Sequence, residues 1–154
     1  MPDIVLYEPE IPQNTGNLIR LSANTGYRLC LIEPMGFHLD EKRLRRAGLD
    51  YREFASVQTF ESFDDYTAHH PDTRIWAFSS KVEHLYTDAD YALDDALLFG
   101  PESRGLPVSV LERIPTSQHL RLPMLTGGRS LNLANAAAIA TYESWRQLGF
   151  VNGA

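Results

Sequence analysis

The sequence is short of several residue types and patterns that mark common functional classes. It has one cysteine, Cys30, in 154 residues, which excludes an intramolecular disulfide and a cysteine-based zinc site. Cys30 stands inside the apolar run Leu29–Ile32, so we expect a buried side chain and not a reactive thiol. No apolar run approaches the roughly 18 residues of a membrane span, and the N-terminus lacks the pattern of a signal peptide. We therefore expect a soluble, cytoplasmic protein with no membrane partner.

Positive charge is scarce as well. Fourteen Lys and Arg stand against twenty Asp and Glu, which gives a net charge of −6, whereas a general nucleic-acid binder is usually basic. The segment Lys42–Arg52 departs from this balance, since it carries five positive charges and one aspartate. Such a run is often only a solvated surface, but Tyr51 adds a stacking surface to it. Any contact with nucleic acid is expected here.

Familiar catalytic motifs are missing too. The sequence contains no GxxxxGK[ST] phosphate loop, no GxGxxG after its first apolar run and no HExxH. Among the five histidines, His69 and His70 are adjacent, but on a helix they point about 100° apart. No carboxylate is spaced to complete a site with them. We predict that the protein holds no metal.

The chain does contain a regular alternation of short apolar runs and helical patterns, in an ordinary composition with 44% hydrophobic residues. The predicted strands are Ile4–Tyr7, Leu29–Ile32, Phe54–Val57, Ile75–Phe78, Ala96–Phe99 and Leu120–Pro123. The predicted helices are Asn14–Thr25, Asp40–Ala47, Ser62–His69, Pro107–Arg113 and Ser130–Leu148. Apolar runs of this kind are typical of strands buried on both faces. We predict one α/β domain over residues 1–154, with a mostly parallel sheet and helices on both faces.

The last predicted helix is rich in alanine over its first half. Small residues allow close backbone approach, which suits deep packing in the core and suits a subunit interface equally well. Alanine also favours helices for its own sake, so the sequence leaves the two interpretations open.

Three segments carry more polar and glycine residues than a turn needs. In the first, Asn14–Arg20, a helix cap explains Asn14 but not Asn17 and Arg20, which follow at intervals of three residues. The second, Phe99–Pro107, leads from a buried strand through two glycines to a helix, at the sheet edge where α/β proteins bind ligands.

The third segment, Leu122–Asn135, joins a glycine-bearing loop to the last helix. Ser130 is a candidate cap for that helix, and the backbone of Thr126–Arg129 could hold a polar ligand. Asn132 and Asn135 stand in an otherwise apolar stretch, where their amides require hydrogen-bond partners.

Taken together, the three segments resemble the motifs of the SPOUT superfamily, the trefoil-knotted RNA methyltransferases that use S-adenosyl-L-methionine. The matching residues are Asn14-x-Gly16-Asn17-x-x-Arg20, then Phe99-Gly100-Pro101-Glu102-Ser103-Arg104-Gly105-Leu106-Pro107, then Arg129-Ser130-Leu131-Asn132-Leu133-Ala134-Asn135-Ala136. The resemblance covers nearly the whole chain and is strongest to the minimal YibK-like (TrmL-type) members, which methylate the wobble position of tRNA.

This resemblance implies an α/β fold whose C-terminal part forms a deep trefoil knot, which no periodicity in the sequence would reveal. It also implies a homodimer that binds S-adenosyl-L-methionine within the knot. By position, the residues expected to meet the cofactor are Phe78, Ser79, Gly100, Glu102, Leu122, Met124, Ser130 and Leu131.

The implied reaction is attack of a ribose 2′-hydroxyl on the methyl group of the cofactor. In the family Arg20 would be the base, supported by Asn14, Glu102, Ser130 and Asn132. A guanidinium holds its proton too tightly to be a good base, so Arg20 could instead hold a phosphate and stabilise the developing alkoxide. The RNA-binding residues expected are Arg20, Lys42, Arg43, Arg45, Arg46 and Arg129.

The implied substrate is the anticodon stem-loop of tRNA-Leu, with a cytidine or 5-carboxymethylaminomethyluridine at wobble position 34. Two other interpretations stay open. One is 2′-O-methylation of a different RNA, such as rRNA. The other is a non-catalytic module that binds S-adenosylmethionine and RNA, which the presence of Arg20, Glu102 and Asn132 disfavours.

Overall fold

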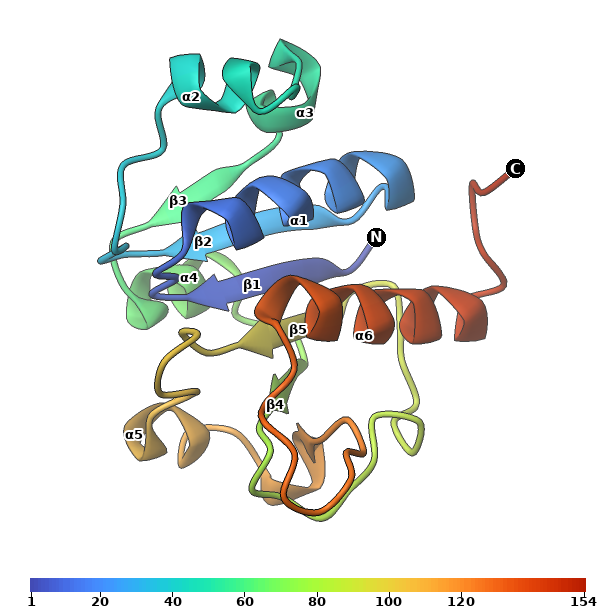
Figure 1. Ribbon diagram of the computed structural model, residues 1–154. Helices are drawn as coiled ribbons and strands as arrows, with labels where there is room; N and C mark the ends of the chain where they lie inside the picture. The colour runs from blue at the N-terminus through green and yellow to red at the C-terminus, as the bar shows by residue number, and fades with distance from the viewer.

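The computed structural model describes residues 1–154 and is built around one six-stranded sheet (Figure 1). The strands are β1 (Asp3–Tyr7), β2 (Arg28–Ile32), β3 (Gln58–Phe60), β4 (Ile75–Phe78), β5 (Ala96–Phe99) and β6 (His119–Leu120). They lie in the order β3-β2-β1-β5-β4-β6, and every pair is parallel. All six carboxyl ends therefore lie at one edge of the sheet.

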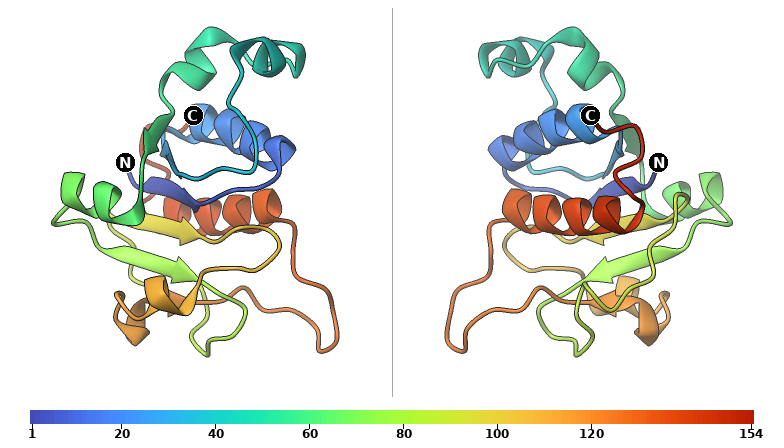
Figure 2. Two further views of the ribbon diagram at one scale, coloured as in Figure 1. Left: turned by 90° about the vertical axis from the view of Figure 1, so that its left-hand side faces the viewer. Right: turned by 90° about the vertical axis from the view of Figure 1, so that its right-hand side faces the viewer.

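Side chains of each strand alternate between two cores, one on each face of the sheet. In β1, Ile4 and Leu6 belong to the core that contains side chains of α1 (Pro12–Thr25) and α6 (Leu133–Gln147). Val5 belongs to the opposite core, with side chains of α4 (Phe63–His69) and α5 (Val108–Leu111). Helices flank both sides of the sheet in the two views of Figure 2. The predicted α/β class is thereby confirmed.

One predicted strand is wrong. Phe54–Val57 was expected to be extended, but Tyr51–Ala55 forms the short helix α3, and the strand β3 follows it. The reason is a capping box. Asp50 accepts a 3.0 Å hydrogen bond from Glu53 N, and Glu53 accepts one of 2.7 Å from Asp50 N. These two side chains start a helix that the β propensity of the following residues does not overcome.

Two predicted helix caps are also wrong. Helix α1 begins at Pro12, two residues before Asn14, so the Asn14 side chain does not cap the helix. Helix α6 begins at Leu133, and its cap is Asn132 and not Ser130. The helix predicted over Pro107–Arg113 and the strand over Leu120–Pro123 are both shorter in the structure. The end of α1 at Gly26 is as predicted, with a φ of 76°.

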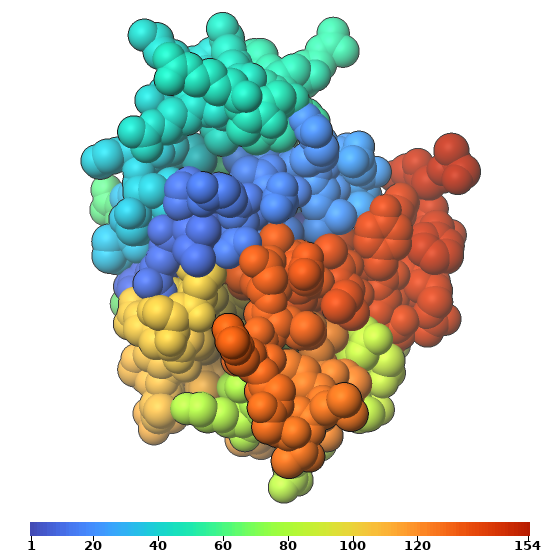
Figure 3. All heavy atoms as spheres, viewed as in Figure 1, coloured from blue at the N-terminus to red at the C-terminus, as the bar shows by residue number.

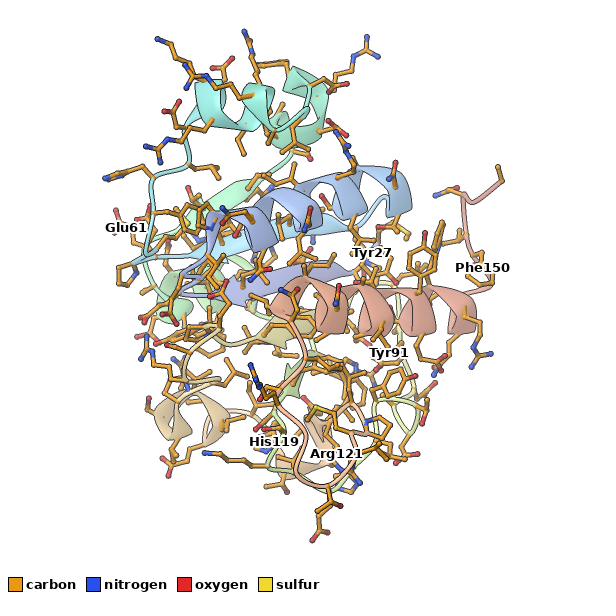
Figure 4. The ribbon with its side chains drawn as sticks, viewed as in Figure 1. Tyr27, Glu61, Tyr91, His119, Arg121 and Phe150 are labelled. Carbon is orange, nitrogen blue, oxygen red and sulfur yellow. The ribbon has the colours of Figure 1, made fainter.

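The chain after β6 runs beside the long loop that follows β4. Arg121, labelled in Figure 4, donates from its backbone N to His84 O at 2.8 Å and accepts from Tyr86 N at 2.9 Å. Near the C-terminal end of α6, the Tyr27 hydroxyl lies 2.6 Å from Ser144 Oγ.

The trefoil knot itself stays a prediction. No helix has both the length and the apolar character that crossing a membrane requires.

Cys30 lies in the core, as predicted. Its side chain is fully buried, and this burial raises the pKa of the thiol to about 12. The thiolate form is therefore suppressed at neutral pH.

A buried carboxylate organises the amino end of β4 and β5. Asp95 accepts two hydrogen bonds from the guanidinium of Arg74, at 2.9 and 2.8 Å. It accepts two more from Trp76 Nε1 and Ala92 N, both at 2.8 Å. The arginine lies partly in solvent, whereas the indole is buried, so the indole N–H depends on Asp95 for its acceptor.

We predict that Asp95→Ala lowers the free energy of unfolding by about 2–4 kcal/mol, because buried donors lose their acceptor. Urea unfolding measures the effect. Asp94→Ala removes an exposed neighbouring carboxylate and is expected to stay within about 0.5 kcal/mol of the wild type. Equal values for the two variants would contradict the role given to Asp95.

Candidate active site

The loops after β4, β5 and β6 begin side by side. Phe78 is in register with Phe99 on one side and with Leu120 on the other. The first residue after β4, Ser79, donates its backbone N–H to Leu120 O at 2.9 Å. Ser79, Gly100 and Leu122, predicted to share one ligand, are therefore brought to the same edge of the sheet.

Gly100 allows the loop after β5 to fold back tightly. A Cβ at this position would lie 2.2 Å from the backbone nitrogen of Leu106 and 2.3 Å from the carbonyl carbon of Gly105. No side chain fits in that space. Gly105 itself has a φ of +66°, which favours glycine. Both glycines of this loop are thus required by its geometry, which is the close approach that the sequence predicted.

Glu102, presented by this loop, closes the N-terminus of α1. Its carboxylate accepts hydrogen bonds from the backbone N–H groups of Glu10, at 2.7 Å, and Ile11, at 3.1 Å. These donors precede the first turn of the helix and have no intrahelical acceptor. A carboxylate at a helix N-terminus is also favoured by the helix dipole. Glu102 is thereby fixed by backbone groups 91 and 92 residues away in the sequence.

Asn14 and Asn132 extend this arrangement. Asn14 Nδ2 donates to Glu102 Oε1 at 3.3 Å, which leaves Asn14 Oδ1 to accept from Asn132 Nδ2 at 2.9 Å. Asn132 Oδ1 in turn caps α6 by accepting from Asn135 N at 3.2 Å. Glu102, Asn14 and Asn132, which we call the polar relay, join the loop after β5 to α1 and α6. Asn132 finds the partner predicted for it, whereas the exposed Asn135 side chain has none.

Two contacts beside the polar relay were missed by sequence reasoning. Ser103 donates to Glu10 through its hydroxyl, at 2.7 Å, and through its backbone N–H, at 3.1 Å. These hydrogen bonds lower the pKa of the Glu10 carboxyl. Arg104 forms an ion pair with Glu8. Nothing in the spacing predicts either contact, because each depends on β1 and β5 being neighbours in the sheet.

Arg20 is not part of the polar relay. Its Nε donates to Glu53 Oε1 at 3.2 Å, and its Nη2 donates to the backbone carbonyl of Gly48. The guanidinium therefore lies against α3 and the turn before it, and half of the side chain is exposed. Within this chain the structure brings together three of the five predicted catalytic residues, Asn14, Glu102 and Asn132, and leaves Arg20 and Ser130 apart from them.

The predicted cofactor residues not yet described lie either in the core or on the exposed loop before α6. Phe78 stacks on Phe99 with ring centroids 4.6 Å apart, and its ring belongs to the core. Met124, Ser130 and Leu131 lie on the exposed loop between β6 and α6, which extends away from the body in Figure 2. On that edge the backbone N–H groups of Leu122 and Met124 donate no hydrogen bond within the chain. They are free to bind a ligand.

The predicted RNA-binding residues lie at three places, and the first is Arg20 on α1, described above. Lys42, Arg43, Arg45 and Arg46 are exposed on α2 (Glu41–Arg46), in the teal lobe at the top of Figure 3. Tyr51, on α3 in the same lobe, is also exposed. Arg45 pairs with Glu41, and the other three side chains form no ion pair. Arg129 lies on the exposed loop before α6.

Comparisons with known proteins agree with this architecture. The model of the SpoU rRNA Methylase family matches residues 2–142. The chain is 57% identical over 150 residues to the tRNA (cytidine(34)-2′-O)-methyltransferase of Aeromonas hydrophila, covering 97% of this chain and 96% of that protein.

Two solved structures are similar as well. One is described as giving structural insights into the 2-OH methylation of C/U34 on tRNA. It superposes with a TM-score of 0.88 at 47% identity over 97% of both chains. The other is the SpoU methyltransferase AviRb from Streptomyces viridochromogenes in complex with AdoMet. It has a TM-score of 0.82 at 22% identity, covers 99% of this chain and 58% of that one, and supports the fold alone.

We predict that Glu102→Gln lowers the free energy of unfolding by about 1–2 kcal/mol. The amide has one acceptor oxygen in place of two and no charge at the helix N-terminus. Urea unfolding tests this, with Glu112→Gln as the control because Glu112 is exposed and forms no side-chain hydrogen bond. If both substitutions cost the same, Glu102 does not hold α1 as described.

Proposed function

The chain belongs to the SpoU rRNA methylase family, and from this membership we propose that it is an S-adenosylmethionine-dependent 2′-O-methyltransferase of the tRNA wobble nucleotide. The observation that carries the proposal is the full-length identity of 57% to a relative named for methylation of cytidine 34. The sequence motifs of the polar relay agree with it. We further propose that residues 1–154 act as one catalytic domain, and that it works in the cytoplasm on tRNA-Leu carrying cytidine or 5-carboxymethylaminomethyluridine at position 34.

The edge of the sheet fits the cofactor. Free backbone N–H groups at Leu122 and Met124 match the ring nitrogens of an adenine. The exposed apolar side chains of Met124 and Leu131 can cover its faces. Ser79, Gly100 and Ser130 would complete the pocket. When bound, S-adenosylmethionine supplies a methyl group already activated by its positive sulfur.

The protein's own contribution is to align the ribose with that methyl group, which can be worth about 7–11 kcal/mol. The polar relay supports this, because it holds α1, α6 and the loop after β5 in one arrangement. Ser130, on the loop before α6, would orient the ribose. A fixed framework of this kind avoids reorganisation when charge develops on the 2′-oxygen.

We assign Arg20 an electrostatic role. An arginine is a poor base at neutral pH. Here the guanidinium donates hydrogen bonds to the Glu53 carboxylate and the Gly48 carbonyl. Arg20 would hold a phosphate of the target and stabilise the developing alkoxide, while water takes the proton. Arg129 would contact the same strand of RNA from the loop before α6.

The basic face of α2 supplies the contact with the anticodon stem-loop. Lys42, Arg43, Arg45 and Arg46 are exposed on one short helix beside Tyr51, in a chain with a net charge of −6. Phosphate contacts from such a patch provide affinity and make binding dependent on salt. The acidic remainder of the chain would confine the RNA to this side.

We also propose a homodimer through α6. Its outward face exposes Ile139 to 41% and Tyr142 to 47%, whereas the opposite face of the helix is buried in the core. Exposed apolar residues on a helix whose first half is rich in alanine suit a close, two-fold packing of identical helices.

Methyl transfer from labelled S-adenosylmethionine tests the proposed function. The purified protein is incubated with bulk tRNA and with rRNA, and the modified nucleotide is mapped. We expect label in tRNA, at the 2′-hydroxyl of position 34. Label only in rRNA would support the second candidate, which the name of the family model favours. No incorporation into any RNA would leave a non-catalytic binding module.

We predict that replacing Arg43, Arg45 and Arg46 together by glutamine weakens tRNA binding at least about tenfold and flattens its dependence on salt. Each lost phosphate contact should lower the slope of log affinity against log salt by about 0.7–0.9. Filter binding over a range of salt concentrations measures both. Arg113→Gln, on another part of the surface, serves as the control. An unchanged slope would show that these arginines do not contact RNA phosphates and form only an ordinary solvated surface.

We predict that Ile139→Glu converts the dimer to a monomer, because two charges would face each other in a desolvated contact. Sedimentation velocity at micromolar concentration measures the change. Val108→Glu places the same charge at a 67% exposed position on α5 and should leave the dimer intact. Dissociation by both variants, or by neither, would show that the interface lies elsewhere.

A further inference from the structure

A cavity of about 370 Å³ opens between the first half of α1 and the segment 37–49. Its size is within the range of about 300–1,000 Å³ that small-molecule sites occupy. The apolar part of its lining includes Leu39, Leu44 and Leu49. Polar groups come from Asn17, Asp40 and Arg43. Neither the predicted cofactor residues nor the polar relay line this cavity.

Gly16 lies on the α1 side of the cavity. A glycine inside a helix costs stability relative to alanine, and Gly16 has no positive φ that would require it. A Cβ at this position would meet only Leu49 Cδ1, at 4.0 Å, which is ordinary contact. At Gly100, by contrast, a Cβ would lie 2.2 Å from the backbone nitrogen of Leu106, so only glycine fits there. Packing therefore does not account for Gly16, and the space that it leaves faces the cavity.

The lining suits a flat heterocycle with polar edges. Phe37 and His38 contribute rings, and the Asn17 amide and the Asp40 carboxylate contribute hydrogen-bonding groups. Bases of single-stranded RNA loops are bound in this way, by stacking and by contacts to their edges.

The surroundings favour RNA over a free small molecule. Arg20 and Arg43 lie on the lining, and Arg43 belongs to the basic face of α2, so phosphates on either side of a bound base would meet cations. Gln13, in the first turn of α1, also lies on the lining.

We propose that this cavity binds one unstacked base of the anticodon loop and that Gly16 keeps it open. The proposal rests on the proposed function and adds to it a site at which a base is held during methylation.

The test combines filling of the cavity with removal of the base. Gly16→Leu places a side chain in the cavity, and Ala23→Leu adds the same side chain to the same face of α1, about two turns further on and outside the cavity. Binding is measured by filter assay with anticodon stem-loop hairpins, intact or carrying one abasic nucleotide at each loop position in turn. Calorimetric binding of S-adenosylmethionine is measured in parallel.

We expect one abasic position to weaken binding to the wild type by about tenfold or more. Gly16→Leu should weaken binding of the intact hairpin by the same factor. It should not weaken binding of that abasic hairpin any further. Ala23→Leu and cofactor binding should match the wild type. If Gly16→Leu does not fold, Phe37→Ala, which removes a ring from the cavity wall, is measured in the same cycle with the same expectation.

The proposal would be overturned if Gly16→Leu weakened binding of every abasic hairpin by as much as it weakens binding of the intact one. It would also be overturned if no abasic position weakened binding to the wild type. Failure of the proposed function is a separate result, since it appears as absence of methyl transfer by the wild type. A protein that methylates position 34 but shows no coupling to Gly16 would therefore refute the cavity alone.

Discussion

The hydrogen bonds of Glu102 at the start of α1 are the constraint on which the proposed site depends. Two backbone donors that cannot be satisfied within the helix are bound by a carboxylate from a loop that follows a different strand. That loop also contains Gly100, at the edge where the cofactor is proposed to bind. Because Asn14 and Asn132 continue the contact into α6, one carboxylate sets the relative position of two helices and a binding loop.

This constraint also explains how an acidic chain can be arranged to act on RNA. Much of the negative charge near the site is engaged: Glu102 and Glu10 accept hydrogen bonds, and Glu8 pairs with Arg104. Among the four cations of α2, only Arg45 pairs with a carboxylate. The chain therefore has a net charge of −6 but also one face that favours phosphate. Partition of charge, and not its total, decides what the surface can bind.

The fold could be predicted where local signals were decisive. The apolar runs of β4 and β5 were located to the residue, and Gly26 was identified as the end of α1. Residues 54–57 were misassigned because the capping box of α3 outweighs β propensity. Asn132 was singled out by its position in an apolar stretch, whereas Asn14, Glu102 and Asn132 were named together only through the family resemblance. Their contacts were not predicted, since these depend on strand order. The position of Arg20 beside Glu53 likewise depends on how α3 packs on α1.

A double-mutant cycle on Asn14 and Asn132 tests most directly whether the polar relay works as one unit. Methyl transfer to tRNA is measured under single-turnover conditions for Asn14→Ala, Asn132→Ala and the double variant. Since each substitution breaks the same 2.9 Å hydrogen bond, the double variant should be no more than about threefold slower than the slower single variant. A rate reduction equal to the product of the two single reductions would show independent residues and would contradict this account.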